Sequence, residues 1–279
     1  MKEIRADAAE IARLANRRRA DVITMIHRAN AGHTGGALSV LDVLSVLYYG
    51  VLNVRPEEPE WEDRDRFLLS KGHSVEGYLA LLADRGFFPA EELRTFSKAG
   101  SRLIGHPNNK VPGVEVNTGA LGHGLPVGVG MALGAKRLGK SYRTYVIMGD
   151  GEQAEGSVWE AAMAGANYQL DHLYAIIDRN GLQISGATEE VMALGDLRAK
   201  WSAFGWDVTE VDGHDIQAML DYFRHTGPKA KPRCLICRTV KGRGLPCAEN
   251  NKDWHHKVPN AEQVREGYQA LGVEGVSWA

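Results

Sequence analysis

Two short apolar runs, each ending in a polar residue, constrain the fold of this chain more than any other feature. Residues 142–148 (YRTYVIM) and 173–178 (LYAIID) are rich in β-branched and aromatic side chains, and a helix-like segment, residues 157–168, separates them. Short continuous apolar runs are typical of strands buried on both faces, and a helix between two of them is typical of a parallel strand pair. The carboxyl ends of the two strands are therefore expected at one edge of a sheet.

The same alternation of strands and helices extends along the chain. Further strands are predicted over residues 65–69, 206–211 and 233–240, and helices over 3–30, 38–49, 76–85, 126–138 and 215–224, with a helix and tail over 260–279. Alternation of this kind favours an α/β fold, a parallel sheet with helices on both faces. Since no internal linker, repeat or low-complexity tract interrupts the pattern, we expect one domain over residues 1–279.

A candidate metal site follows the two central strands. Asp150 and Asn180 each come directly after one of them, so a carboxylate and an amide oxygen should meet beyond the sheet edge. Such oxygens, with the carbonyl of Leu182, can hold a hard divalent cation that phosphate oxygens complete. Gly149 and Gly151 would let the backbone approach a diphosphate. Asp-Gly and Asn-Gly are also common turn dipeptides, but turns alone explain neither the spacing nor the strand ends.

Composition excludes several classes of function. The formal charge of −2, from 33 basic and 35 acidic residues, predicts no nucleic-acid or membrane partner. The chain has no apolar run of about 18 residues and no secretory apolar region, so we expect a cytoplasmic protein. Cys234 and Cys237 lie three positions apart on a predicted strand, which turns them to opposite faces and argues against a zinc or redox pair.

Several further segments carry glycine and histidine in a recognisable order. They are residues 30–39 (NAGHTGGALS), 65–73 (DRFLLSKGH), 105–107 (GHP), 112–122 (PGVEVNTGALG) and 253–259 (DWHHKVP). Together with the stretch from Gly149 to Asn180, they resemble the N-terminal, diphosphate-binding half of the transketolase family over nearly the whole chain. The resemblance implies the cofactors thiamine diphosphate and Mg²⁺ (or Ca²⁺ or Mn²⁺), and transfer of a two-carbon ketol unit.

The resemblance also implies roles for individual residues. His33 and His106 would line the hydroxyls of the donor sugar, and His255 would lie near the reacting carbon, where a neutral imidazole can accept a hydroxyl proton. His73 would contact the diphosphate, and Ile184 the thiazolium region. The other implied cofactor contacts are Gly119, Leu121, Gly149, Asp150, Gly151, Glu155 and Asn180. Without the resemblance, each histidine alone would be read as a surface or hydrogen-bonded core residue.

Glu155 admits two interpretations. It could cap the helix expected from Ser157, where a carboxylate is favourable. By resemblance, it instead joins a carboxylate relay at the contact between cofactor-binding halves, and this second interpretation is preferred. Two histidines depart from the family pattern: His123 replaces a usual glutamine, and His256 replaces a usual glycine. The donor pocket is therefore expected to differ from that of a housekeeping transketolase.

The pyrimidine-binding half of the family is absent from these 279 residues. We therefore expect a split enzyme, in which a second subunit carries the pyrimidine-binding domain, as an α2β2 assembly acting on sugars or sugar phosphates. One alternative is a specialised transferase for an unusual sugar, a sulfosugar or a carrier-bound acceptor. Another is a non-catalytic scaffold, against which the retained Asp150, Asn180 and histidines argue.

Overall fold

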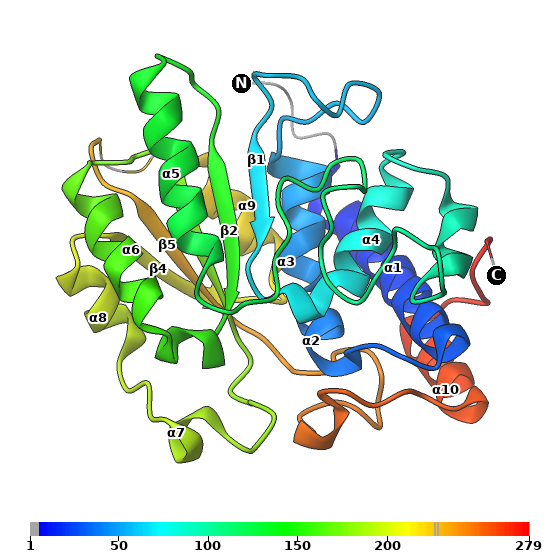
Figure 1. The fold of residues 1–279 in the computed structure, drawn as a ribbon. Coiled ribbons are helices and arrows are strands. Elements are labelled where there is room, and N and C mark those ends of the chain that lie inside the picture. The colour runs from blue at the N-terminus through cyan, green and yellow to red at the C-terminus, as the bar shows by residue number, and fades with distance from the viewer. Residues whose placement is uncertain (1–5, 226, 228, 279) are drawn as a thin grey trace.

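The computed structural model describes residues 6–225, 227 and 229–278, and the described residues form one five-stranded parallel sheet (Figure 1). The strand order is β1-β2-β3-β5-β4. The strands are β1 (Arg66–Leu69), β2 (Thr144–Gly149), β3 (Leu173–Arg179), β4 (Asp207–Asp212) and β5 (Arg233–Arg238). Every neighbouring pair is parallel. The predicted strands are therefore confirmed, with bounds shifted by one or two residues.

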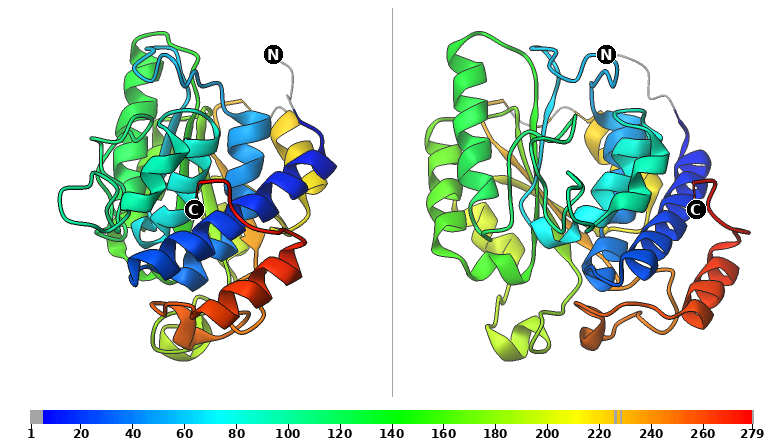
Figure 2. Two further views of the ribbon diagram at one scale, coloured as in Figure 1. Left: turned by 90° about the vertical axis from the view of Figure 1, so that its right-hand side faces the viewer. Right: turned by 45° about the vertical axis from the view of Figure 1, so that its right-hand side comes forward.

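Helices cover both faces of the sheet, as predicted (Figure 1). One face carries α5 (Gly124–Arg137), α6 (Gly156–Asn167) and α8 (Leu197–Ala203). The other carries α1 (Ala8–Ala29), α2 (Thr34–Ser39), α3 (Leu41–Val46), α4 (Val75–Asp84) and α9 (Ile216–Arg224). Figure 2 shows α10 (Ala261–Leu271) packed on the outside of α1. None of the helices described is long and apolar enough to cross a membrane.

Side chains alternate between two hydrophobic cores along each strand. In β2, Tyr145 and Ile147 pack into the core beneath α1, whereas Val146 packs into the core beneath α5. The same alternation separates Cys234 from Cys237, since each lies in a different core. Both thiols are buried and free, and the prediction that they point to opposite faces of the strand is confirmed.

Two helix predictions need correction. The first helix begins at Ala8, because the Asp7 side chain accepts a hydrogen bond from the Glu10 N–H at 2.8 Å and caps it; residues 3–5 of the predicted helix lie outside the described residues. The predicted helix over 38–49 is in fact α2, α3 and a π-helical turn, Leu47–Val51, closed by the Leu52 N–H bonding to the Leu47 carbonyl at 2.7 Å.

The carboxyl ends of all strands point to one end of the molecule, which is the lower end in Figure 1. Two long loops project beyond it: residues 180–195, which contain α7 (Thr188–Val191), and residues 239–258. Short helices also lie along the chain: η2 (Gly72–Ser74), η3 (Ala90–Thr95), η4 (Gly151–Ala154) and η5 (Lys252–Trp254). Ligands of open parallel sheets bind at this end.

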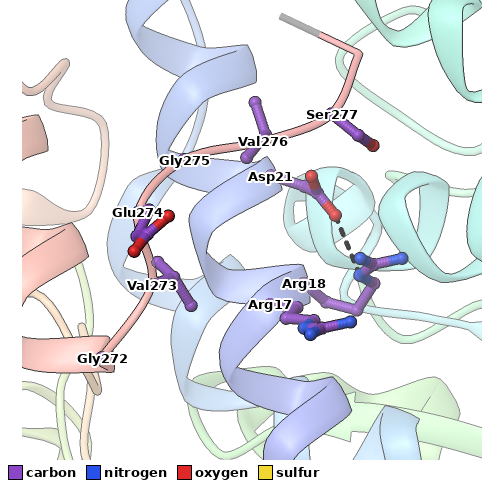
Figure 3. Close-up of a pocket in the computed structure, with 9 residues that line it drawn as sticks. All are labelled: Arg17, Arg18, Asp21, Gly272, Val273, Glu274, Gly275, Val276 and Ser277. Carbon is purple, nitrogen blue, oxygen red and sulfur yellow. Dashed lines mark ion pairs between the residues drawn. The ribbon is translucent and has the colours of Figure 1, made fainter.

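The C-terminal segment runs back over α1 and closes a pocket of about 450 Å³ (Figure 3). Beyond α10, the buried Trp278 donates a hydrogen bond from its indole N–H to Asp21 at 2.6 Å. Asp21 also pairs with Arg18 at 2.8 Å, as the dashed line in Figure 3 marks. Burial outweighs these contacts and raises the pKa of Asp21 to about 6.

Candidate active site

Asp150 lies where β2 ends, against the end of β3. The pairing of Gly149 with Asp178 brings the two carboxyl ends together, as the two apolar runs predicted. One carboxylate oxygen of Asp150 accepts the Gly151 N–H at 2.8 Å, and the other accepts the Gly181 N–H at 2.6 Å. Arg179 approaches the same carboxylate at 3.2 Å. Burial, and then repulsion from Asp178, raises the pKa of Asp150.

Asn180 and Leu182 lie in the loop that follows β3. The Asn180 side-chain oxygen accepts the Leu182 N–H at 3.1 Å, and the Leu182 carbonyl accepts a hydrogen bond from Lys241 at 3.3 Å. Among the described residues, no group of three or more histidine, cysteine or acidic side chains has metal-site geometry. A carboxylate, an amide oxygen and a carbonyl oxygen are nevertheless the hard donors that Mg²⁺ accepts alongside phosphate and water.

Five histidines meet at the same end of the sheet, and we call them the histidine cluster. They are His33, His73, His106, His255 and His256. The ring of His33 is central: its centroid lies 5.6 Å from that of His73, 6.0 Å from His106 and 5.8 Å from His255. His73 and His255 stack at 5.1 Å. The structure therefore brings together the four histidines that the sequence singled out for sugar and diphosphate contacts.

The environment of the cluster lowers the pKa values of four of its imidazoles. Burial, followed by repulsion from His256, lowers the pKa of His33 to about 4. Burial, followed by repulsion from Lys241, lowers the pKa of His255 to about 3. Burial also lowers the pKa values of His73 and His106. Neutral imidazoles offer one nitrogen as a hydrogen-bond acceptor, so the cluster is suited to binding hydroxyl groups at neutral pH.

Two buried lysines connect the cluster to the strand ends, and sequence reasoning missed both. Lys71 forms an ion pair with Asp178 and donates to the Gly36 carbonyl at 3.2 Å. Lys241 lies 3.0 Å from the His255 Nδ1 and also contacts the Leu182 carbonyl. Burial, and then repulsion from Lys71, lowers the pKa of Lys241 to about 8. Since Asp178 neutralises Lys71, Lys241 supplies the positive charge that could attract an anion beside the histidine cluster.

Two glycines on the floor of the site lie very close to neighbouring side chains. Gly119 has φ +141°, and a Cβ there would lie 2.7 Å from the His106 ring. A Cβ on Gly72 would lie 2.8 Å from the Thr118 hydroxyl oxygen. A side chain at either position would therefore displace the groups that shape the floor. The carbonyl of Leu121 faces outward to His123, and the Ile184 side chain is 68% exposed rather than packed in the core.

The buried glutamate of this region is Glu152 rather than Glu155. The Glu152 carboxylate accepts hydrogen bonds from the Ser70 hydroxyl, the Gly122 N–H at 2.8 Å and the Gly149 N–H at 3.0 Å. Glu155 is the N-cap residue of α6, as the capping interpretation expects, although its exposed side chain makes no capping hydrogen bond. Its place in a carboxylate relay stays a prediction.

The two departures from the family pattern have different positions. The ring of His256 lies 4.6 Å from that of His33, inside the histidine cluster. His123 instead stands at the start of α5, where its ring contacts the Leu121 carbonyl at 3.1 Å and lines a surface groove with Asn117 and Val127. Only His256 therefore changes the shape of the cluster itself.

These features define a class of protein, and comparison with known sequences names it. Residues 11–277 match the family model described as "Transketolase, thiamine diphosphate binding domain". The chain belongs to the transketolase family, and the parallel sheet with its site beyond the strand ends is that family's diphosphate-binding fold.

Within the family, the chain is similar to single subunits of split transketolases. It is 51% identical over 257 residues to an apulose-4-phosphate transketolase subunit of Phocaeicola vulgatus, covering 92% of this chain and 91% of that protein. It is 37% identical over 252 residues to a 6-deoxy-6-sulfo-D-fructose transketolase subunit of a Clostridium species, covering 90% and 92%. The chain is thus built as the N-terminal subunit of a split transketolase, as the sequence predicted.

Solved transketolases share the fold. The structure of transketolase from Campylobacter jejuni superposes with a TM-score of 0.92 at 27% identity, over 98% of this chain and 44% of that chain. Transketolase from Leishmania mexicana gives a TM-score of 0.89 at 28% identity, over 94% and 41%. The chain therefore spans less than half the length of these solved chains.

Proposed function

We propose that this chain is the diphosphate-binding subunit of a two-subunit enzyme that transfers a two-carbon ketol unit from a ketose or ketose phosphate to an acceptor sugar. The observation that supports this most is the meeting of the histidine cluster with Lys71, Lys241 and the strand-end residue Asp150. Neutral proton acceptors beside an anion site are the parts such a reaction needs from the protein.

The residues present fit thiamine diphosphate and a divalent cation. Lys241 and His73 suit a diphosphate beside a glycine-lined floor, where a side chain at Gly72 or Gly119 would displace Thr118 or His106. Asp150, Asn180 and the Leu182 carbonyl supply the oxygen donors that suit Mg²⁺. A cation there would also offset the repulsion between Asp150 and Asp178. When bound, the cofactor supplies the carbanion and electron sink of the reaction.

The chain's own residues would hold the sugar and move its protons. His33 and His106 would position the donor hydroxyls, and His255 would accept the hydroxyl proton released as the carbon–carbon bond breaks. Both rings are uncharged at neutral pH and can therefore accept a hydrogen bond from a sugar hydroxyl, and the bound substrate would have to raise the pKa of His255 for it to take up the proton. Glu155 lies exposed at the start of α6 and would act across the contact with the second subunit.

We infer that the second subunit carries the pyrimidine-binding domain and that the assembly is α2β2 and cytoplasmic. Relatives that are themselves named as transketolase subunits support a two-subunit enzyme, and three free cysteines suit a reducing compartment. The exposed Ile184, Val191 and Met192 in the loop after β3 offer apolar surface for such a contact.

The donor is proposed to be an uncommon sugar rather than a common pentose phosphate. Two observations favour this: relatives are named for apulose 4-phosphate and 6-deoxy-6-sulfo-D-fructose, and the exposed ring of His256 lies 4.6 Å from that of His33, on the outer side of the cluster. A branched sugar phosphate and a sulfosugar are therefore the first donors to test, with common ketose phosphates as the comparison.

The deciding experiment is product mass analysis on the chain co-expressed with the protein encoded beside it. Thiamine diphosphate, Mg²⁺, one donor and one acceptor are added, and products shifted by a two-carbon unit are expected. Asp150→Ala should abolish both the shift and the Mg²⁺-dependent affinity for thiamine diphosphate, while Asp171→Ala, at the surface, serves as the matched control. If the wild-type pair showed no Mg²⁺-dependent affinity for thiamine diphosphate, a non-catalytic scaffold would be favoured and the proposal overturned.

A further inference from the structure

Glu76 is a fully buried carboxyl group that points at residue 33 from α4. Its side chain is 0% exposed, and its Oε1 atom accepts the backbone N–H of His33 at 2.8 Å. Gly32 makes this approach possible, because a Cβ there would lie 2.7 Å from the same oxygen. The sequence places Glu76 in a helix, and nothing in its spacing marks it as part of the site.

Two buried polar atoms at this contact have no hydrogen-bond partner among the described residues. The His33 Nδ1 lies 4.0 Å from the Glu76 Oε1, and within the described residues neither His33 Nδ1 nor Glu76 Oε2 has a hydrogen-bond partner. Buried polar groups in native proteins are almost always hydrogen-bonded, so an unsatisfied pair beside a candidate active site calls for a functional explanation. Hydrogen bonds of catalytic groups are often long before substrate binds and tighten in the complex.

His33 and Glu76 have different charged and titratable neighbours. The His33 ring is faced by His73, His106, His255 and His256, and Lys241 adds repulsion. The only ion-pair partner of Glu76 within the described chain is His33. The Glu76 carboxylate therefore contacts His33 on its Nδ1 side, and the Nε2 side of the imidazole is available to the other groups of the cluster.

We propose that Glu76 is the positioning residue of His33: it anchors the backbone of residue 33 and holds the imidazole proton on Nδ1, which leaves the Nε2 lone pair free for a sugar hydroxyl. This inference rests on the proposed function, in which His33 contacts the donor. In this arrangement, the separation of 4.0 Å between His33 Nδ1 and Glu76 Oε1 shortens to about 3 Å, the ordinary length of an N–H···O hydrogen bond. A histidine's second nitrogen commonly has its tautomer set in this way by a neighbouring carboxylate.

The titration of the pair supports this arrangement. Burial raises the pKa of Glu76 to about 7, whereas burial and neighbouring cations lower the pKa of His33 to about 4. A proton shared by the pair below neutral pH therefore resides on Glu76 and not on the imidazole. Above about pH 7 the carboxylate is ionised and can only accept, which fixes the proton on Nδ1. The imidazole remains neutral throughout this range.

The test is a tautomer measurement on the full chain labelled with ¹⁵N-histidine. Nitrogen shifts of His33, assigned by comparison with His33→Asn, are followed from about pH 6 to pH 9. The wild-type protein should show the Nδ1–H tautomer at alkaline pH, and Glu76→Gln should lose that preference while still accepting the His33 N–H. Glu92→Gln, whose carboxylate pairs with Arg102 in the wild type, is the matched control and should leave His33 unchanged.

An Nε2–H tautomer in the wild-type protein, or identical His33 shifts in Glu76→Gln, would overturn the proposal. The wild-type result decides the question even if Glu76→Gln does not fold. In the assembled enzyme, Glu76→Gln should lower kcat about 10- to 100-fold with little change in KM, as loss of a supporting carboxylate does elsewhere. The tautomer measurement does not depend on ketol transfer. Failure of the proposed function can therefore be distinguished from failure of the proposed role of Glu76.

Discussion

The imidazole of His256 lies edge-on against that of His33, with ring centroids 4.6 Å apart and ring planes at 64°. A family glycine at this position would leave His33 open on that side. The extra ring therefore covers one side of His33 and adds a further titratable group beside it. This contact separates the present chain from the family pattern at the point where donor sugars are expected to bind.

Replacing His256 with glycine should raise the pKa of His33 from about 4 toward its ordinary value, because repulsion from His256 is the largest contribution after burial. The shift would be followed by an NMR titration of the His33 ring. His123→Ala is the matched control, since His123 lies outside the histidine cluster. An unchanged His33 titration in His256→Gly would contradict the prediction.

Replacing Asp178 with asparagine should destabilise the protein by about 3–5 kcal/mol, because Lys71 would keep a buried charge without a partner. Urea unfolding measures the loss. The double variant Lys71→Met/Asp178→Asn should lose less stability than Asp178→Asn alone, since no unpaired ion remains. A loss below about 1 kcal/mol in the single variant would be expected only for an exposed pair.

Thiol labelling should distinguish the three cysteines. Cys234 and Cys237 are 0% exposed, and burial raises the pKa of both thiols, so neither should react in the native protein. The half-buried Cys247 should react alone, and Cys247→Ser should leave the native chain unreactive. All three thiols should become available in urea. Release of stoichiometric zinc on labelling would contradict the placement of Cys234 and Cys237 on opposite faces of β5.

Stability should fall as pH rises through about 6, in part because of Asp21. The folded pKa of Asp21, raised by burial to about 6, lies above its unfolded value, so its contribution is present below about pH 4 and lost above pH 6. A difference of about two between the folded and unfolded pKa values corresponds to about 3 kcal/mol. Between pH 4 and pH 8, the free energy of unfolding should change by about 3 kcal/mol less in Asp21→Asn than in the wild type. An equal change in the two proteins would contradict a raised pKa for Asp21.

The strands and their common edge could be predicted because the signal is local. Runs such as residues 173–178 are apolar at nearly every position, which a strand buried on both faces explains, and the helix between two runs sets their direction. From that geometry, the meeting of Asp150 with the loop at Asn180 follows. The histidines could be singled out because each adjoins a glycine or follows a family motif.

The groups that support these residues could not be predicted, because their role depends on burial that sequence does not reveal. Lys71 and Lys241 are of a residue type that is normally exposed, and both are buried. Glu152 and Glu155 lie in the same glycine-rich stretch, yet only Glu152 turns inward to bond Ser70 and two backbone N–H groups. Ile184 matched a family contact, but its side chain faces solvent in this chain.

The carboxylate of Asp178 has a further consequence for how this protein can diversify. It accepts hydrogen bonds from Ser39, Lys71 and Thr239, and so joins the segments that follow α1, β1 and β5 to the end of β3. A change at any one of these positions disturbs all of the others. Under the proposed function, changes in sugar preference are therefore expected in the loop that carries the exposed His256, rather than at the buried residues that meet at Asp178.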